Sequence, residues 1–324
     1  MECPLTESLL LSAPAARSGP PGPAERVLPL RRPGRWAAGI VVLVLAAQAA
    51  HGLTTNPFYQ WDRFAYWFVR PVILDGLLIT LQVAAYSAVL GLAGGVLLAL
   101  GRLSGSPVLR SASWTYIWLF RSVPLIVVLL FLYNLSALYP TLSIGVPFGP
   151  AFLTFDESRL ATDIVVAVVG LSLSEAAYAA EIVRAGVLSV DQGQHEAAAA
   201  LGLPKRYQFA RIVFPQALRS IVPSYVNQLI GLLKATSLVF YVSLLDLFGS
   251  VQSLGSTYPG DVVPLLLVAT VWYVILTSLV SVVQFYVERH YARGALRTVP
   301  PTPLQRARAG LLDLRIRFRK ETAR

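Results

Sequence analysis

Cysteine and lysine are nearly absent from this sequence of 324 residues. It contains one cysteine, Cys3, three histidines and three lysines. A single cysteine excludes an internal disulfide framework and offers no metal cluster. Charged residues make up only 14% of the chain, hydrophobic residues make up 55%, and the mean hydropathy is +0.61. This balance is too apolar for a soluble domain of this length, so the sequence predicts an integral membrane protein.

The sequence also lacks a loop for binding nucleotide phosphates. That motif places Gly-Lys-Ser/Thr four residues after a first glycine, whereas Lys205, Lys234 and Lys320 all lack a preceding glycine. No arrangement of Ser/His/Asp, Cys/His or paired carboxylates indicates an enzyme. We therefore expect no catalytic residue, no metal site and no cofactor on this chain.

The net charge of +10 could indicate a nucleic-acid-binding protein, but the excess is confined to the two ends. Residues 1–35 carry five basic and three acidic residues, residues 289–324 carry ten and two, and the segment between them carries twelve of each. Basic residues that flank membrane spans usually face the cytoplasm and anionic lipid. We therefore expect membrane lipid, and no nucleic acid, as the partner of this charge.

Six apolar runs are long enough to cross about 30 Å of hydrocarbon. They lie near residues 36–53, 72–100, 113–139, 160–184, 217–247 and 262–288. The first run follows a leader, residues 1–35, that is rich in Pro, Gly, Ala and Ser and is predicted to be disordered. Because so long a leader is unusual before a cleaved signal peptide, we interpret residues 36–53 as an extra N-terminal transmembrane helix.

Charges in the connecting segments predict the orientation. Basic residues lie in the second and fourth connections, whereas the alternate connections are acidic or mixed. The basic residues are Arg102, Arg110, Arg184, Lys205, Arg206 and Arg211, and the acidic residues are Asp62, Asp156, Glu157 and Asp261. The leader, residues 1–35, and a basic tail, residues 291–324, are therefore both predicted to be cytoplasmic.

The fourth connection contains an alanine-rich polar segment, Glu196–Gly202. Alanine favours a helix and leaves a face without bulky groups. Asp191 can cap the start of this helix, Gly202 can end it in a left-handed turn, and Pro204 prevents it from continuing. The sequence predicts a short cytoplasmic helix near residues 191–203 that docks on another protein. An amphipathic connector on the lipid surface is the alternative, but it would need large apolar residues on one face.

The spacing of this segment resembles the cytoplasmic loop signature of permease subunits of bacterial ABC importers. The matching residues are Glu196, Ala197, Ala198, Gly202, Ile212 and Pro215, with Phe214 where that family usually has Leu. Flanking residues resemble the polar amino acid branch, which carries His, Glu, Gln, Arg or opines. These flanking residues are Ala177–Arg184, Gly193-Gln194, Pro215–Arg219 and Leu233–Leu238.

The resemblance covers residues 72–290 and implies an all-α polytopic membrane protein. Of its six transmembrane helices, five would form a type I (MetI-like) ABC importer core. The chain would then be a permease subunit in the bacterial inner membrane, forming the pathway for a polar amino acid or related small zwitterion, and not an enzyme. The implied partners are an ABC ATP-binding subunit that holds ATP and Mg, a second permease subunit, identical or paralogous, and an extracytoplasmic solute-binding protein.

In that family the short cytoplasmic helix is a coupling helix, which sits in a groove of the ATP-binding subunit. The resemblance therefore assigns coupling to the segment near residues 191–203. Its implied coupling residues are Gly193, Glu196, Ala197, Ala198 and Gly202.

Ionisable residues at membrane depth are costly and usually face a cavity or a partner. Glu175 lies well inside the fourth predicted span and Lys234 well inside the fifth. We hypothesise that both face one central cavity, where they pair with each other or bind the amine and carboxylate of a zwitterion. The alternative is a structural ion pair or a more superficial placement of these residues. Further candidates for the pathway are Asn227, Gln228, Thr236 and Ser237.

The resemblance implies that Arg121 and Pro124, in the third predicted span, are candidate gate residues, and the proline would also kink the helix there. The alternative is that Arg121 extends to the inner membrane boundary. The family usually has Arg-Gly-Thr-Pro here, so Ser122 and Val123 depart from it. Ala235 likewise replaces the acidic residue that usually follows the lysine.

Three other charged residues have local interpretations. Glu181 and Arg184, three residues apart near the end of the fourth span, are predicted to form an ion pair. His195, within the coupling segment, is interpreted as an exposed contact and not as a switch.

Two other classes of function stay open from the residues alone. A stand-alone secondary transporter or channel for small polar solutes should show inverted repeats, and none is visible. A membrane scaffold or sensor would use the basic tail, residues 306–324, as its active part, since that tail has amphipathic character. A positive-inside anchor is the alternative for the same tail.

Overall fold

The structure is a computed structural model that describes residues 33–135, 141–145, 151–156 and 163–291. The chain separates into two units, residues 1–56 and residues 57–324. In the first unit the described residues form α1 (Pro33–Thr55), which contains a stretch apolar enough to cross a membrane. The helix predicted at residues 36–53 is therefore present.

The start of α1 corrects the predicted boundary of the leader. Residues 33–35, which the sequence assigned to the leader, form the first turn of α1. Proline favours that position because its fixed φ suits the first turn of a helix. The remaining leader, residues 1–32, and the basic tail from residue 292 lie outside the described residues.

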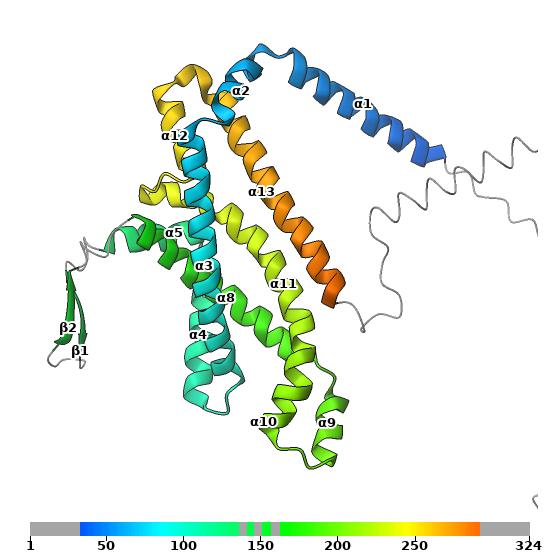
Figure 1. The fold of residues 1–324 in the computed structure, drawn as a ribbon, viewed down its shortest axis with the longest axis vertical. Coiled ribbons are helices and arrows are strands. Elements are labelled where there is room, and N and C mark those ends of the chain that lie inside the picture. Colours follow the sequence, from blue (N-terminus) through cyan, green and yellow to red (C-terminus); the bar gives the residue numbers. More distant parts are fainter. Residues whose placement is uncertain (1–32, 136–140, 146–150, 157–162, 292–324) are drawn as a thin grey trace, which may run out of the picture. The chain divides into compact units, whose positions relative to one another are not determined.

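The second unit is built mainly from helices (Figure 1). Its elements are η1 (Pro57–Tyr59), α2 (Trp61–Phe68), α3 (Pro71–Leu103), α4 (Pro107–Ser122), α5 (Leu125–Tyr133), β1 (Thr141–Gly145), β2 (Ala151–Asp156), α8 (Asp163–Leu188), α9 (Gln192–Ala200), α10 (Lys205–Gln208), η2 (Phe209–Val213), α11 (Phe214–Ala235), η3 (Thr236–Val242), α12 (Leu247–Thr257), η4 (Pro259–Asp261) and α13 (Val262–Tyr291). Across the described residues, four helices are long and apolar enough to cross a membrane, and up to six spans result if each of two bent pairs counts as one. The predicted all-α membrane fold is confirmed.

The third predicted span is one of the bent pairs. α4 and α5 meet at an angle of 100°, with Val123 and Pro124 between them. Val123 has extended backbone angles, φ −87° and ψ 129°, because the ring of a following proline disfavours the helical conformation. The predicted kink at Pro124 is confirmed, and the described part of the run, residues 113–135, contains two helices, α4 and α5, instead of one.

A β-hairpin between α5 and α8 was not predicted. β1 and β2 pair antiparallel, with Thr141 opposite Asp156 and a register irregularity between Ile144 and Gly145. The segment contains β-branched and aromatic residues and a Gly- and Pro-rich connection, which together favour a hairpin. Neither strand belongs to a long apolar run, so hydropathy alone does not indicate the hairpin.

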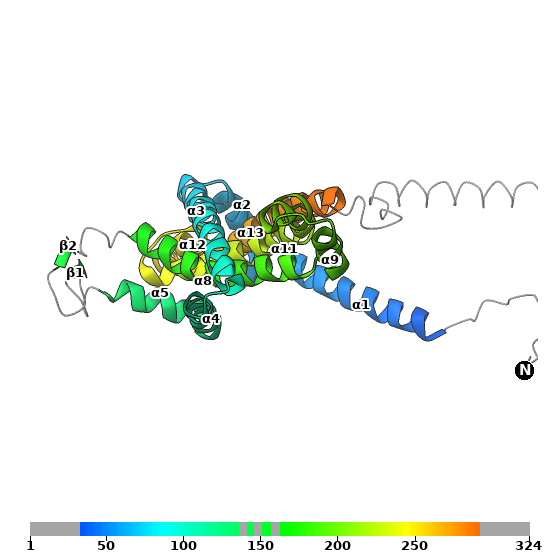
Figure 2. The same cartoon turned by 90° about the horizontal axis from the view of Figure 1, so that it is seen from below.

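α3 and α8 form the most extensive helix–helix contact, and they lie side by side in both views (Figures 1 and 2). Small residues line this contact. A Cβ added to Gly95 of α3 would lie 2.5 Å from the Cβ of Ala179 and 2.9 Å from the backbone nitrogen of Ala180 in α8. The two backbones therefore approach closely, as small residues allow in membrane helix pairs.

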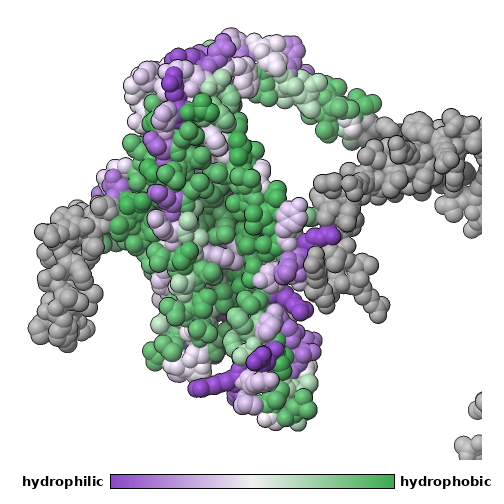
Figure 3. Space-filling view, in the orientation of Figure 1, coloured by the Kyte–Doolittle hydropathy of each residue, from purple (hydrophilic) through white to green (hydrophobic). Residues whose placement is uncertain are grey.

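The surface of residues 57–291 is hydrophobic over the long helices (Figure 3). Hydrophilic residues gather at two ends, around α2 and around α9 to α11. This distribution is typical of a protein whose middle lies in hydrocarbon and whose ends lie in water.

Candidate functional site

α9 is the short helix predicted near residues 191–203. Oδ1 of Asp191 accepts a hydrogen bond from the backbone N–H of Gly193 at 2.7 Å and so caps the first turn. After the helix, Gly202 has a φ of 67°, a left-handed conformation that favours glycine. Pro204 then precedes α10. The two ends of α9 are thus formed as the sequence predicts.

α9 has an exposed face and an inward face. Gly193, Glu196 and Ala197 lie about one turn apart and are exposed. Ala198 is only 2% exposed, and His195 is half-buried, on the face that packs toward η2. The exposed face is available to a partner, whereas Ala198, one of the implied coupling residues, faces its own chain.

Glu175 lies in the middle of α8 with 3% of its surface exposed. Its Oε2 accepts a hydrogen bond from Nε2 of Gln228 in α11 at 3.1 Å. Its Oε1 is buried and has no hydrogen-bond partner among the described residues. A buried carboxylate oxygen without a donor is costly, so this atom marks a candidate functional position.

Gly91 of α3 provides the room for Glu175. A Cβ at Gly91 would lie 2.6 Å from Cγ and 2.7 Å from Cβ of Glu175, closer than carbon atoms pack. The glycine therefore lets a carboxylate side chain fit between two closely packed helices.

Glu175 borders a cavity of about 360 Å³ between the α4–α5 bend, α8 and α11. Arg121 and Pro124, the candidate gate residues, line the same cavity, together with Tyr178 and Gln228. The guanidinium carbon of Arg121 lies 5.5 Å from the centre of the Tyr178 ring, within range of a cation–π interaction. The structure thus brings Glu175 and both gate candidates together.

Lys234 does not share this cavity. It is exposed and lines a second cavity of about 420 Å³ with Ser237, Phe248 and Tyr273. No hydrogen bond or ion pair reaches its ammonium group from the described residues. Lys234 lies on a different face of α11 from Gln228, so the expected meeting of Glu175 and Lys234 is not found in this chain.

The other pathway candidates are dispersed. Asn227 is exposed and accepts a hydrogen bond from Nε2 of Gln284 in α13 at 3.3 Å. The hydroxyl groups of Thr236 and Ser237 donate to carbonyl groups three residues earlier, and Thr236 is fully buried. Of the polar candidates, only Gln228 contacts Glu175.

Glu181 and Arg184 form the predicted ion pair on α8. Nη2 and Nε of Arg184 donate to Oε2 of Glu181 at 2.7 Å and 3.1 Å. Arg121 and Arg102 also act electrostatically on Glu181. Positive charge therefore exceeds negative charge at this end of α8.

Asp246, which precedes α12, is fully buried and connects three elements. Its Oδ1 accepts from the backbone N–H of Gly249 at 2.8 Å, which caps α12. Its Oδ2 accepts from the hydroxyl groups of Thr80 in α3 and Tyr273 in α13, both at 3.3 Å. Thr80 in turn accepts from the backbone N–H of Leu247 at 3.0 Å.

A second connection at the same end joins α2 to η4, which leads directly into α13. Nε of Arg63 donates to Oδ1 of Asp261 at 2.9 Å, and Nη2 of Arg63 bonds to Oδ2. The indole N–H of Trp67 donates to the same Oδ2 at 2.8 Å. Bidentate pairing with an added donor holds a carboxylate firmly.

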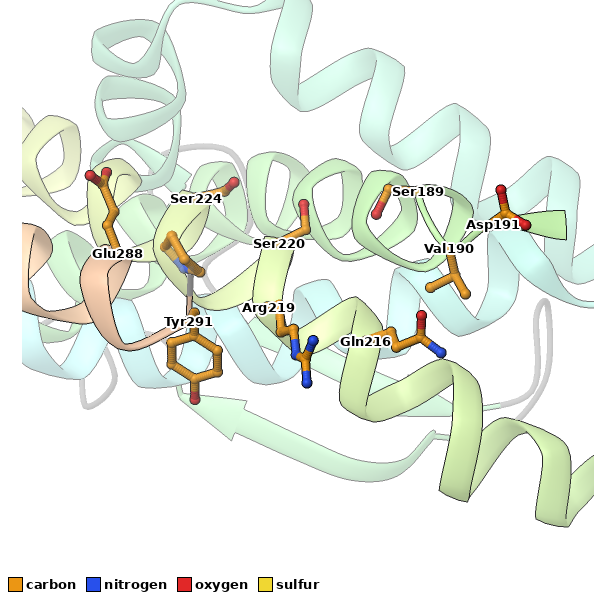
Figure 4. Close-up of a pocket in the computed structure, with 10 residues that line it drawn as sticks. Ser189, Val190, Asp191, Gln216, Arg219, Ser220, Ser224, Glu288 and Tyr291 are labelled. Atoms are coloured by element: carbon orange, nitrogen blue, oxygen red, sulfur yellow. The ribbon is translucent and has the colours of Figure 1, made fainter. Parts of the chain in front are cut away.

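A larger cavity, of about 720 Å³, lies beside α11 (Figure 4). Its lining includes Ser189, Asp191, Gln216, Arg219, Glu288 and Tyr291. Figure 4 shows Arg219 and Tyr291 pointing one way and Glu288 pointing the other way, so the charged groups do not converge. The cavity leaves open space beside the first turns of α11. Among the described residues, no group of three or more His, Cys, Asp and Glu side chains could hold a metal ion.

The long apolar helices, with a carboxylate buried between them, are those of a polytopic membrane protein, and comparisons with known proteins give its family. Residues 91–293 match the family described as binding-protein-dependent transport system inner membrane component. The chain is 39% identical over 293 residues to the arginine transport system permease protein ArgU of Corynebacterium glutamicum, covering 90% of each protein. It is 34% identical over 234 residues to the glutamate/aspartate import permease protein GltK of Escherichia coli O6:H1, covering 72% of this chain and 100% of GltK.

Solved structures support the same fold. A crystal structure of an amino acid ABC transporter with histidines matches with a TM-score of 0.58 and 28% identity, covering 68% of this chain and 94% of that one. An inward-facing MetNI methionine ABC transporter matches with a TM-score of 0.50 and 21% identity, covering 70% and 97%. The second match shows the fold alone, and it confirms the MetI-like architecture.

With more than half of its length matched, the chain belongs to the family of inner membrane components of binding-protein-dependent transport systems. The prediction of a multi-pass permease subunit of an ABC importer is confirmed.

Proposed function

We propose that this chain carries a polar amino acid and that Glu175 binds the solute's ammonium group. The unpartnered Oε1 of Glu175 is the observation that supports this proposal most directly. An ammonium group that enters the 360 Å³ cavity beside it would supply the missing donor and an opposite charge. Arg121, on the wall of the same cavity, offers a cation for the solute's carboxylate.

The named relatives agree with a zwitterionic solute. ArgU is named for arginine and GltK for glutamate and aspartate. These side chains differ in charge, but every amino acid has an α-ammonium and an α-carboxylate group. A site formed by Glu175 and Arg121 recognises what those solutes share, and the side chain is then selected elsewhere.

In this proposal the exposed face of α9 binds a separate ATP-binding subunit. Gly193, Glu196 and Ala197 form the contact, and Gly202 sets the turn that follows. That partner holds ATP and Mg, while this chain has no catalytic role and no cofactor. The basic residues near α9 support placing it in the cytoplasm, with both termini on that side.

The pathway in this proposal needs two further partners. A second permease subunit, a copy or a paralogue, completes the wall, and the exposed cavity around Lys234 is a candidate surface for that side of the pathway. An extracytoplasmic binding protein delivers the solute to the end that carries α2 and α12.

Transport by the reconstituted complex tests the role of Glu175. We expect Glu175→Gln to lower ATP-dependent uptake of radiolabelled arginine or glutamate by about tenfold or more, because a charge-assisted hydrogen bond is lost. Glu288→Gln is the matched control, since Glu288 is exposed and bonded to Gln284 at 2.8 Å. Lys234→Met tests the second cavity in the same assay. Unchanged uptake and selectivity in both Glu175→Gln and Lys234→Met would contradict the proposal.

A further inference from the structure

α9 is attached to the rest of the chain in two ways. Its first residue follows α8 after the short connection Ser189–Asp191. Its middle is held by Gln208, the last residue of α10, whose Nε2 donates to the backbone carbonyl of His195 at 2.9 Å. The same Nε2 lies 3.4 Å from Nδ1 of the His195 ring. Both contacts are partly buried, and they explain why His195 is not the exposed residue that the sequence suggested.

Gln208 stands where a regular helix gives way to a π-helix. Lys205–Val242 is one continuous helical segment, here called the helical arm, and its residues Phe209–Val213 form the π turn η2. Pro215 explains the turn, because a proline ring clashes with the carbonyl four residues earlier, that of Arg211, in a regular α-helix. A π turn is a local defect in the helical hydrogen-bond ladder and often lies at functional sites.

The helical arm leads from α9 to the Glu175 cavity. α11 begins directly after η2 and carries Gln228, the residue that donates to Glu175. Beside its first turns lies the open 720 Å³ cavity, which Gln216 and Arg219 border. The arm therefore has room to move, and its far end forms part of the cavity wall.

We propose that Gln208 is a positioning residue that joins α9 to the helical arm, so that a displacement of α9 moves α11 and the wall of the Glu175 cavity. Without the bond from Gln208 to His195, α9 would be held to the arm by the connection Leu201–Pro204 and by the packing of its inward face toward η2, so less of its displacement would reach α11. This inference rests on the proposed function, in which an ATP-binding subunit moves α9.

Solute transported per ATP hydrolysed is the decisive measurement. The full complex with its ATP-binding subunit and binding protein is reconstituted in proteoliposomes, with radiolabelled arginine, glutamate and glutamine as probes. Gln208→Leu keeps the size of the side chain but removes the donor. We expect about fivefold less solute per ATP, the lower range of coupling between distant sites, while ATP hydrolysis and assembly of the complex persist.

Two control variants distinguish the loss of this hydrogen bond from a general disruption of α9 or the helical arm. Gln216→Leu removes a side-chain bond of similar length, from Nε2 of Gln216 to the carbonyl of Ile212 at 3.0 Å, that stays within the helical arm. His195→Ala removes the ring but keeps the backbone carbonyl that accepts from Gln208. Both should retain at least about half of the wild-type ratio of solute to ATP, less than the change expected for a coupling residue. A loss in either variant equal to that of Gln208→Leu would overturn the assignment.

Amide hydrogen exchange tests the bond from Gln208 to His195 without any transported solute. In the full-length protein in nanodiscs, Gln208→Leu should raise amide exchange across Gln192–Ala200 by about fivefold or more, and Gln216→Leu should not. Equal exchange in wild type and Gln208→Leu would overturn the inference. If the wild-type complex shows no ATP-dependent uptake, the proposed function fails, and the exchange result still decides whether Gln208 holds α9.

Discussion

The two ends of the second unit are held in different ways. At the α12 end, defined by Asp246 and Asp261 with their partners, two buried carboxylates accept five hydrogen bonds from side chains of α2, α3 and α13, and Asp246 also caps α12. At the α9 end, defined by Asp191–Gln208, the helix is mostly exposed and one side chain, that of Gln208, ties it to the helical arm. Several hydrogen bonds between elements therefore hold the α12 end, whereas few contacts hold the α9 end.

This difference separates a fixed region from a movable one. Segments with few buried contacts open at lower free energy than segments in a bonded core. A helix that is to follow the movement of a partner is expected to have few buried contacts, as α9 does. In the proposed function, the α12 end is the fixed reference against which the helical arm would move.

Asp246→Ala should lower the stability of the α12 end more than the other substitutions below. It leaves the N–H of Gly249 and the hydroxyl group of Tyr273 without this acceptor in a buried place, while the hydroxyl group of Thr80 keeps the carbonyl of Gly76, at 3.0 Å, as an acceptor. We expect a loss of about 2–4 kcal/mol in stability. Thermal unfolding of the purified protein, followed by tryptophan fluorescence, measures the change.

Asp246→Asn is the control for that variant. Its amide oxygen still accepts from Gly249, and the two hydroxyl groups can rotate to accept from its NH₂ group. A midpoint close to wild type is expected. If Asn destabilises the protein as much as Ala does, the charge matters and the hydrogen bonds alone do not explain the α12 end.

Gly76→Ala should weaken the same end by crowding it. A Cβ at Gly76 would lie 2.8 Å from the backbone oxygen of Asp246, which cannot move away as a flexible side chain can. We expect a loss of about 1–3 kcal/mol, measured by the same unfolding assay. The matched change at the α9 end is Gly193→Ala, whose Cβ would meet only Oδ1 of Asp191, also at 2.8 Å. An equal loss in both variants would remove the contrast between the ends.

Asp191→Ala should have the smallest effect. Asp191 and Asp246 both cap a helix, but the bond from Gly193 to Asp191 is exposed. Loss of an N-cap costs about 1 kcal/mol, here confined to α9. Faster amide exchange over Gln192–Ala200 with an unchanged unfolding midpoint is the expected result. A shift of the midpoint as large as that of Asp246→Ala would show that α9 is not an independent region.

Local rules were enough to predict the features that depend on neighbouring residues. The caps of α9 follow from Asp191 and Gly202, and the bend between α4 and α5 follows from Pro124. The ion pair of Glu181 and Arg184 follows from their spacing. Each involves residues a few positions apart, so sequence order alone brings them together.

Features that depend on distant residues were missed or misplaced. Glu175 and Lys234 were expected in one cavity because both interrupt apolar spans, but the rotation of α11 about its axis turns Gln228, not Lys234, toward Glu175. Asp246 interacts with Thr80, 166 positions away. No sequence motif surrounds Gln208. Its proposed role depends on the way the chain folds back so that α10 lies beside α9.

The fit of Glu175 against Gly91 also limits how this chain can diverge. A side chain at position 91 would occupy space that the carbon atoms of Glu175 already fill. Because a Cβ at position 91 would lie 2.7 Å from the Cβ of residue 175, any side chain there would have to displace Glu175 or move α3 away from α8. The packing of α3 on α8 and the place of the buried carboxylate are thus coupled at this one contact.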